Sequence, residues 1–270
     1  MNTVIQVFER IKQTVVLISK QLHFSKFQNR LGRKLALSIE ESISLALFKQ
    51  KQNIATKKSV FEILEPSCSY KTMVVNMNRW AKLALAALGL ILHFNRQHQH
   101  LIKHTDSTDL PVCLLKNVDR HRTMRGIASL SQHGQGWYYG LKLHLTSDLN
   151  KHILALKFTS ADGNDRQTFL KLNQDLSGVF VADSGYVSSQ LATEFYQENR
   201  RMLFTKPYKT MKKIITPWQF WLYNTRMLIE LNFRNLKLFY GLITSLPRSV
   251  DGYLANYIYS LLAYSLSVKN

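Results

Sequence analysis

The stretch of sequence that decides the fold runs from residue 137 to residue 160 and reads WYYGLKLHLTSDLNKHILALKFTS. Leucines at every second position of 141–145 alternate with polar residues, which is the pattern of a strand with one buried face. The segment SDLNK (147–151) is typical of a turn, and a second apolar run, HILALKFTS, occupies 152–160. We therefore expect two strands that pair as a β-hairpin.

Elements on both sides of this hairpin follow a regular order. A first strand is expected near 100–108, and the apolar run in GVFVADSGY (178–186) predicts a short strand covered on both faces. The other predicted elements are helices at 165–174 (capped by Asp165), 189–198, 217–241 and 253–266, and a strand at 201–205. An antiparallel meander followed by parallel strands with crossover helices is the chain order of a ribonuclease H-like fold. We therefore predict an α/β protein with a ribonuclease H-like mixed sheet and flanking helices.

An all-helical N-terminal region precedes this sheet. Ser38 with Glu41 three residues later is the pattern of a capping box, which begins a helix. Residues 70–95 predict one long helix with a mostly apolar second half. We therefore divide the chain into a helical region, 1–96, that we expect to bind DNA ends, and a ribonuclease H-like catalytic domain, 97–270.

Net charge is the outlier of the composition, because 36 Lys and Arg against 17 Asp and Glu give a formal charge of +19. A protein this basic attracts polyanions, of which nucleic acid is the commonest. The longest apolar run, residues 83–94, is shorter than the roughly 20 residues that cross a membrane, so it predicts a core helix. Cys68 and Cys113 have no metal-type spacing. We expect a reduced, cytoplasmic protein with no membrane partner.

Three acids stand out against this layout. Asp106 falls on or at the end of the first strand, and Asp183 falls at the carboxyl end of the apolar strand, where ligands gather in α/β sheets. Glu230 is the only acid within 199–249, a segment with ten Lys and Arg. Each acid alone has an ordinary explanation, as a turn former, an N-cap or a surface charge. Their order, combined with a topology that can bring them together, predicts a shared site.

The helix around Glu230 provides a separate test. At about 100° per residue, four of its side chains fall within roughly a 60° arc. They are Tyr223, Arg226, Glu230 and Lys237. The alternative is a core-facing tyrosine beside an ordinary Arg226–Glu230 surface pair, which stabilises a helix by only tenths of a kcal/mol.

The segment before this helix is basic and aromatic. Its lysines could lie along DNA phosphates, or they could form a solvated basic loop; they are Lys206, Lys209, Lys212 and Lys213. Trp218 and Trp221 could stack on an unpaired base. A core position is the alternative for both, and we expect it for Trp221.

These residues together resemble a known family. The spacing Tyr-(2)-Arg-(3)-Glu-(6)-Lys is similar to the signature around the catalytic Glu in DDE-type transposases of bacterial insertion sequences. Three further stretches resemble the family's segments around the first Asp, the following strand and the second Asp: DSTDLPVC (106–113), GWYYGLKLHL (136–145) and VADSGY (181–186). Ser184 departs from the pattern, since the family usually has Lys there, at a contact to the DNA backbone.

The resemblance implies roles for individual residues. It identifies a catalytic, metal-binding triad of Asp106, Asp183 and Glu230, and contacts to DNA ends from Tyr223, Arg226 and Lys237. Asp109 competes with Asp106 for the first place in the triad. The two lie three apart on a strand and face opposite sides, so only one can be a ligand, and the family pattern favours Asp106.

The implied chemistry is phosphoryl transfer on double-stranded DNA. Two hard cations about 3.5–4 Å apart suit this reaction, and Mg²⁺ prefers carboxylate oxygens, so we expect two Mg²⁺ ions with Mn²⁺ as a substitute. The implied function is a transposase that cleaves DNA at transposon ends and transfers the strands into target DNA, and we expect a homodimer on DNA. Two alternatives stay open: a decayed or repurposed DNA-binding protein with the same fold, and a plain metal-dependent nuclease.

Overall fold

The computed structural model describes residues 2–27, 35–133, 136–207, 210–211 and 214–268. The chain forms two compact units, one made of Met1–Ile91 with Asn235–Asn270 and the other of Leu92–Arg234. The division of function between residues 1–96 and 97–270 is a separate matter and stays a prediction. Among the helices described, none has the length and apolar character that a membrane crossing requires.

The first unit is helical and is built around α2 (Ile39–Lys51), which is buried over most of its length. It packs against α1 (Asn2–Gln21), α4 (Tyr70–Arg79) and α10 (Val250–Ser265). The predicted capping box is confirmed, because Ser38 Oγ accepts from Glu41 N at 3.0 Å while Glu41 Oε2 accepts from Ser38 N at 3.1 Å. These two bonds satisfy donors that the start of any helix leaves open.

Two parts of this unit differ from the prediction. The helix expected over 70–95 is two helices, α4 and α5 (Ala81–Gln97), which meet at Trp80. Trp80 has φ −87° and ψ 1°, outside the regular helix, and its ring is buried in the core. A further helix, α3 (Lys57–Leu64), was not predicted; it begins at Thr56, whose side chain accepts from Ser59 N. A large buried ring thus lies at the interruption of a pattern that indicates one continuous helix.

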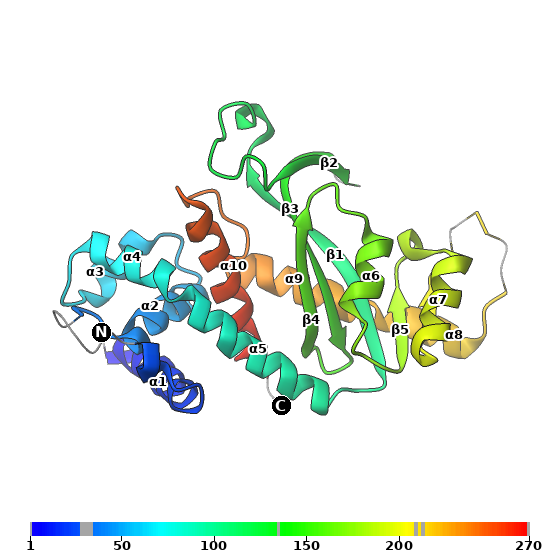
Figure 1. Cartoon of the computed structure of the whole chain (residues 1–270), viewed down its shortest axis with the longest axis horizontal. Coiled ribbons are helices and arrows are strands. Elements are labelled where there is room, and N and C mark those ends of the chain that lie inside the picture. Colours follow the sequence, from blue (N-terminus) through cyan, green and yellow to red (C-terminus); the bar gives the residue numbers. More distant parts are fainter. Residues whose placement is uncertain (1, 28–34, 134–135, 208–209, 212–213, 269–270) are drawn as a thin grey trace. The chain divides into compact units, whose positions relative to one another are not determined.

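The second unit contains a mixed, six-stranded sheet (Figure 1). Its strands are β1 (Ile102–Cys113), β2 (Ser129–His133), β3 (Gly136–Asp148), β4 (Ile153–Ser160), β5 (Val179–Ala182) and β6 (Met202–Thr205). β3 pairs antiparallel with β1, β2 and β4, while β5 runs parallel to both β1 and β6. The hairpin of β3 and β4 and the ribonuclease H-like order are therefore confirmed. The edge strand β2 was not predicted.

Helices cover both faces of this sheet. On one face, α6 (Asp165–Leu172) and α7 (Ser189–Asn199) pack on Phe180 and Ala182 of β5. On the other face, α8 (Pro217–Thr225) places Leu222 against Val179 and Val181. The apolar run of β5 therefore reflects burial on both sides, as the sequence predicted.

The long helix expected from residue 217 to residue 241 is interrupted at Arg226. It consists of α8 and α9 (Met227–Phe239), joined by bonds of the i,i+3 type on both sides of Arg226. Thr225 Oγ1 donates to Leu222 O at 2.7 Å, and a hydroxyl that bonds the preceding turn bends a helix. The break sets Arg226 apart from both regular helices.

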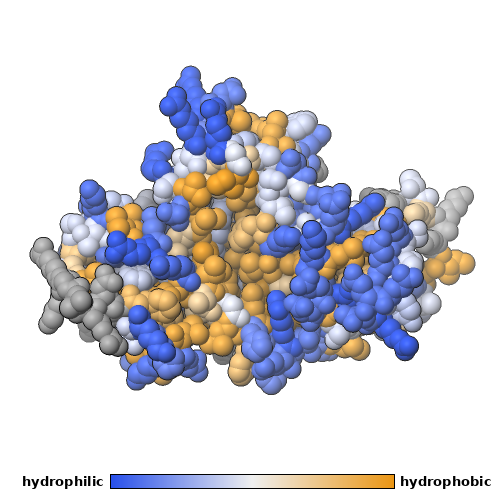
Figure 2. Space-filling model, viewed as in Figure 1, coloured by the Kyte–Doolittle hydropathy of each residue, from blue (hydrophilic) through white to orange (hydrophobic). Residues whose placement is uncertain are grey.

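The segment 114–128 between β1 and β2 is basic. It carries Lys116, Arg120, Arg122 and Arg125 against the single acid Asp119. Figure 2 shows hydrophilic residues gathered at the outer end of this segment, at the top of the view. The unit that holds the three candidate acids therefore also carries an exposed cationic segment.

Candidate active site

Asp106 lies within β1 on the face that α8 covers. His104, two residues earlier, places Nε2 2.9 Å from Thr225 Oγ1 of α8, and side chains two apart on a strand share a face. Asp109 belongs to the opposite face, where its register partner on β3 is Lys142. The structure thus separates the two aspartates.

Asp183 comes next to Asp106 through the pairing of β1 with β5. His104 is the register partner of Val181, and continuing this register by two residues brings Asp183 beside Asp106. Asp183 precedes the short 3₁₀ helix η3 (Ser184–Tyr186), but its carboxylate makes no capping hydrogen bond there. The ordinary role of an aspartate at this position, capping a helix, is therefore not what Asp183 does.

Arg226 connects all three acids. Its Nη1 donates to Glu230 Oε1 at 2.8 Å, and its Nη2 lies 3.2 Å from Asp106 Oδ2 and 3.6 Å from Asp183 Oδ2. The three carboxylates come from β1, the end of β5 and α9, so the fold gathers them around one guanidinium. The planar, forked guanidinium suits this task because it presents several donors at fixed angles.

Burial differs among the members of this cluster, which we call the Arg226 cluster. The side chains of Arg226 and Asp106 are 16% and 17% exposed, whereas those of Asp183 and Glu230 are 43% and 58% exposed. Burial raises the pKa of Asp106 to about 6, against the opposing effect of Arg226 and the Ser107 backbone N–H, with smaller increases from the other two acids. Three carboxylates share one cation, so the cluster is short of positive charge.

This shortage fits a divalent cation. Among the described residues, no three His, Cys, Asp or Glu side chains stand close enough together to hold a metal ion as they are. The three acids converge instead on a guanidinium, which is itself a cation, and carboxylate oxygens are the ligands that Mg²⁺ prefers. The chemistry of the donor set thus fits a metal, with Arg226 in the space between the acids. Their role as ligands stays a prediction.

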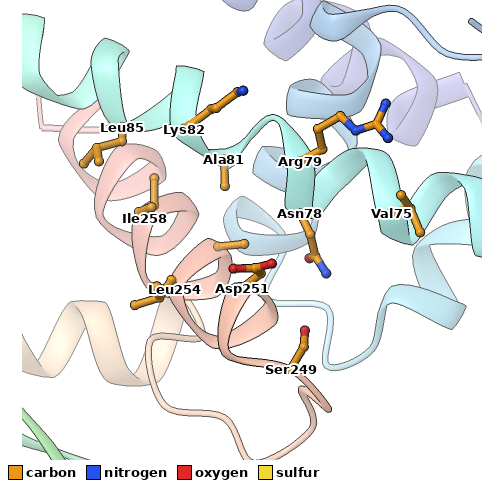
Figure 3. Close-up of a pocket in the computed structure, with 11 residues that line it drawn as sticks. Val75, Asn78, Arg79, Ala81, Lys82, Leu85, Ser249, Asp251, Leu254 and Ile258 are labelled. Atoms are coloured by element: carbon orange, nitrogen blue, oxygen red, sulfur yellow. The ribbon is translucent and has the colours of Figure 1, made fainter. Parts of the chain in front are cut away.

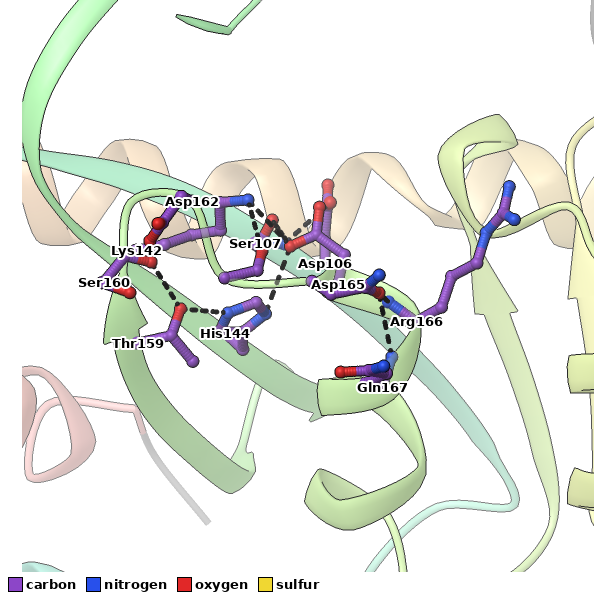
Figure 4. Close-up of polar contacts among 12 residues, drawn as sticks. Asp106, Ser107, Lys142, His144, Thr159, Ser160, Asp162, Asp165, Arg166 and Gln167 are labelled. Atoms are coloured by element: carbon purple, nitrogen blue, oxygen red, sulfur yellow. Dashed lines mark hydrogen bonds and ion pairs between the residues drawn. The ribbon is translucent and has the colours of Figure 1, made fainter. Parts of the chain in front are cut away.

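A second polar cluster lies on the opposite face and was missed by the sequence analysis (Figure 4). Asp165 Oδ1 lies 3.0 Å from Lys142 Nζ, 3.5 Å from Ser107 Oγ and 3.7 Å from His144 Nδ1. Burial lowers the pKa of His144 to about 4, so the ring is neutral, and among the described residues Lys142 is the charged partner of Asp165 at ion-pair distance. The only sequence signal was the predicted cap, and that was wrong: Asn164 caps α6, and Asp165 is its first residue.

The other predicted site residues are not gathered at the Arg226 cluster in the same way. Tyr223 is half-buried on α8, against the core that β5 shares with that helix. Lys237 lies on α9, two turns beyond Glu230. Lys209, Lys212 and Lys213 lie outside the described residues. Trp221 is 47% exposed, so the core position expected for it is wrong.

Comparison with known proteins identifies the family. Residues 96–249, more than half of the chain, match the family described as "Transposase DDE domain". Among solved structures, a piggyBac transposase synaptic complex with hairpin DNA is similar with a TM-score of 0.54 and 10% identity, over 89% of this chain and 70% of that one. The Mos1 mariner paired end complex with Mn has a TM-score of 0.26 and 12% identity, over 95% and 85%. No curated protein sequence matches the chain.

The chain belongs to the family of DDE transposase domains. It is a transposase, an enzyme that cleaves DNA and transfers strands, and enzymes of this class depend on a metal ion. The fold agrees with this membership, because the similarity to the piggyBac transposase extends over most of the chain.

Proposed function

We propose that Asp106, Asp183 and Glu230 are the catalytic, metal-binding residues of this transposase and that the ions are Mg²⁺, two in number, with Mn²⁺ as a substitute. The observation that carries the proposal is the convergence of three acids from separate elements on one guanidinium. Structural ion pairs seldom leave two carboxylates in excess at a partly buried place, because unbalanced buried charge is costly. A site that receives cations accounts for the excess.

Each residue has a role in phosphoryl transfer on DNA. Divalent ions supply activation of the attacking oxygen and neutralisation of the charge that develops on the phosphate. Asp106 would contribute to both ion sites, Asp183 would complete one of them and Glu230, from α9, would complete the other. The backbone of β1 helps to orient Asp106, since its Oδ1 also accepts from Ser107 N at 2.8 Å.

Arg226 holds the acids together when no ion is present. Its guanidinium provides the positive charge that keeps the three carboxylates close, so the site is arranged before the ions arrive. Once ions balance the acids, the guanidinium is available for a DNA phosphate, for which Arg is well shaped. Arg226 would thus contact DNA ends only in the metal-bound enzyme, together with Tyr223 and Lys237.

Further parts of the proposal concern the assembly on DNA. The substrate is double-stranded DNA, as transposon ends and as target, and the enzyme acts as a homodimer. Residues 1–96 contribute specific binding of the ends, while Lys209, Lys212 and Lys213 follow phosphates. The net charge of +19 supports all of these contacts, because each neutralised phosphate releases counterions.

The test replaces each acid by its amide. Asp106→Asn, Asp183→Asn and Glu230→Gln should each abolish cleavage of a transposon-end duplex in Mg²⁺ while duplex binding in EDTA stays within a few-fold of wild type. Asp109→Asn is the matched control, because Asp109 lies on the same strand and faces the other side of the sheet. Wild-type cleavage by any of the three variants would refute that residue's assignment.

The same assay separates the alternatives. A decayed protein is the first alternative, because Ser184 stands where transposases of the resembled family usually have Lys. Such a protein would bind DNA and would cleave it in neither Mg²⁺ nor Mn²⁺. A plain nuclease would cut without joining ends to a target plasmid. Joined products in Mg²⁺ that disappear with Asp183→Asn would support a transposase and contradict both a decayed protein and a plain nuclease.

A further inference from the structure

A cavity in the helical unit has the charge of an anion site. It encloses about 400 Å³ between α2, α3, α4, the loop before α10 and α10 itself. Three cations line it: Lys49, Lys57 and Arg248. No Asp or Glu lines it, and within the described residues none of the three cations lies within ion-pair distance of a carboxylate. Three positive charges thus meet in one cavity without a counter-charge.

Burial in this cavity disfavours the charged forms of Lys49 and Lys57. Lys49 is 8% exposed, and in the described part of the chain its Nζ donates only to Gln50 Oε1, at 3.3 Å. Lys57 Nζ donates to Asn78 Oδ1 at 2.6 Å. Each ammonium has three donors and, among the described residues, meets one neutral side-chain oxygen, so it has donors available for an anion. Burial lowers the pKa of both lysines to about 8, and for Lys57 repulsion by Lys49 adds to this effect.

Two helices begin at the same cavity. Thr56 caps α3, and Ser249 caps α10 by accepting from Gly252 N at 3.1 Å. Thr56, Ser249 and Gly252 all line the cavity. The partial positive charge of both helix N-termini therefore adds to that of the three side chains.

A neighbouring cavity, which shares α4 and α10 with the first, includes an acid in its lining. It encloses about 610 Å³ and is lined by Arg79 and Lys82, but Asp251 lies among its lining side chains (Figure 3). Asn78 and Ser249 line both cavities. Of these two neighbouring cavities, the one of Lys49, Lys57 and Arg248 has cations but no acid in its described lining.

We propose that the cavity of about 400 Å³ binds a phosphate group, held by Lys49, Lys57 and Arg248 and by the N-terminus of α10. The volume exceeds that of a single phosphate, and Val74 and Leu246 supply apolar wall, so a sugar attached to the phosphate also fits. A phosphodiester of the DNA backbone is the expected source, and this source, though not the phosphate site itself, rests on the proposed function. A free phosphate or nucleotide is the other source.

The first experiment uses inorganic phosphate and the full chain, without divalent metal. At about ten times its dissociation constant, phosphate should raise the melting temperature by about 2–4 °C over sodium chloride of equal ionic strength. Lys57→Met and Arg248→Gln should lose this shift. Lys58→Met is the matched control and should keep it, because Lys58 is exposed and pairs with Glu62 at 3.4 Å.

The same variants separate a ligand site from a structural role. If the lysines form an anion site, Lys57→Met should melt no lower than wild type in chloride, since the substitution removes the repulsion between Lys57 and Lys49. A lowered melting temperature in chloride together with an unchanged phosphate shift would overturn the proposal. So would a wild-type protein that shows no shift with phosphate.

The second experiment identifies the source of the phosphate. Binding of a short duplex is titrated with salt for wild type, Lys58→Met and Arg248→Gln. A slope flattened by about one phosphate contact in Arg248→Gln alone supports the DNA backbone as the source. An unchanged slope, with the phosphate shift lost, supports a free phosphate or nucleotide and overturns DNA. Neither assay involves cleavage, so failure of the catalytic assignment leaves both results interpretable.

Discussion

The sheet of the second unit carries a carboxylate cluster on each face, and the two clusters are balanced in different ways. In the cluster of Asp165, the carboxylate of Asp165 pairs with the ammonium of Lys142 at 3.0 Å. In the Arg226 cluster, three acids meet one guanidinium. Both combine acids with cations on the same scaffold, so the presence of charge does not distinguish structure from function. The imbalance of charge distinguishes them, because an excess of negative charge favours the binding of a cation.

The largest effect on stability should come from removing the guanidinium. Arg226→Ala leaves three carboxylates without their shared cation and should destabilise the metal-free protein by about 2–3 kcal/mol, less than for a fully buried pair because two of the acids are exposed. Mg²⁺ or Mn²⁺ should restore part of the loss. Thermal melts with and without the ion measure both. Equal melting of variant and wild type in EDTA would show that Arg226 does not hold the acids.

Removing an acid from the same cluster should act in the opposite direction. The pKa of Asp106 is raised from 3.8 to about 6, so at pH 7 the folded state holds an ionised group that it disfavours. Asp106→Asn should therefore stabilise the metal-free protein at pH 7 by up to about 3 kcal/mol. The gain should shrink as the pH falls through 6 and vanish well below pH 3.8, where the wild-type carboxyl is neutral in both the folded and the unfolded state. A gain that does not change between pH 7 and pH 4 would contradict this assignment.

The balanced cluster should respond as an ordinary ion pair does. Asp165→Asn removes the carboxylate that pairs with the 14% exposed Lys142, whose Nζ still donates to Gly163 O, and should cost about 1–2 kcal/mol. Divalent ions should not restore the loss, and DNA cleavage should stay within a few-fold of wild type. Melts of Asp165→Asn and Arg226→Ala side by side, with and without Mg²⁺, test the comparison directly. If a divalent ion restored the stability of Asp165→Asn, the distinction between the two clusters would be contradicted.

The smallest effect is expected at Lys237. Lys237→Ala should flatten the plot of log affinity for DNA ends against log salt by at most one phosphate contact. Arg226→Ala should flatten it more in Mg²⁺, because a planar fork holds a phosphate better than a point charge does. Salt titrations in Mg²⁺ and in EDTA measure both slopes. If the slope of Arg226→Ala differs from wild type equally in EDTA, the guanidinium contacts DNA whether or not metal is bound.

The sequence predicted the sheet well because its signals are local. Alternating leucines in β3, the turn after it and the apolar run of β5 each act over fewer than about ten residues. The capping box at Ser38 is local in the same sense. The predicted acids could also be placed on their elements, since strand order and alternation follow from these local signals.

The interruptions of the two long helices could not be predicted in this way. Trp80 lies at one interruption and its ring is buried in the core, and Thr225 lies beside the other and shares its hydroxyl with His104, 121 residues earlier. The exposure of Trp221 likewise depends on which neighbours surround it. The pairing of Arg226 with three acids was missed for the same reason: its partners Asp106 and Asp183 are distant along the chain, and only Glu230 is visible at helical spacing.

The alternation along β1 has a consequence for how genes of this kind decay. Asp106 faces the Arg226 cluster and its neighbour Ser107 faces Asp165, so the two faces are assigned by the count of residues before them. Loss of a single codon early in β1, with β5 unchanged, would turn Asp106 toward α6 and bring a serine to the place of an acid. Most substitutions along the same strand would leave the count intact. The number of residues in β1 therefore indicates whether a copy is inactive as much as the identity of those residues does.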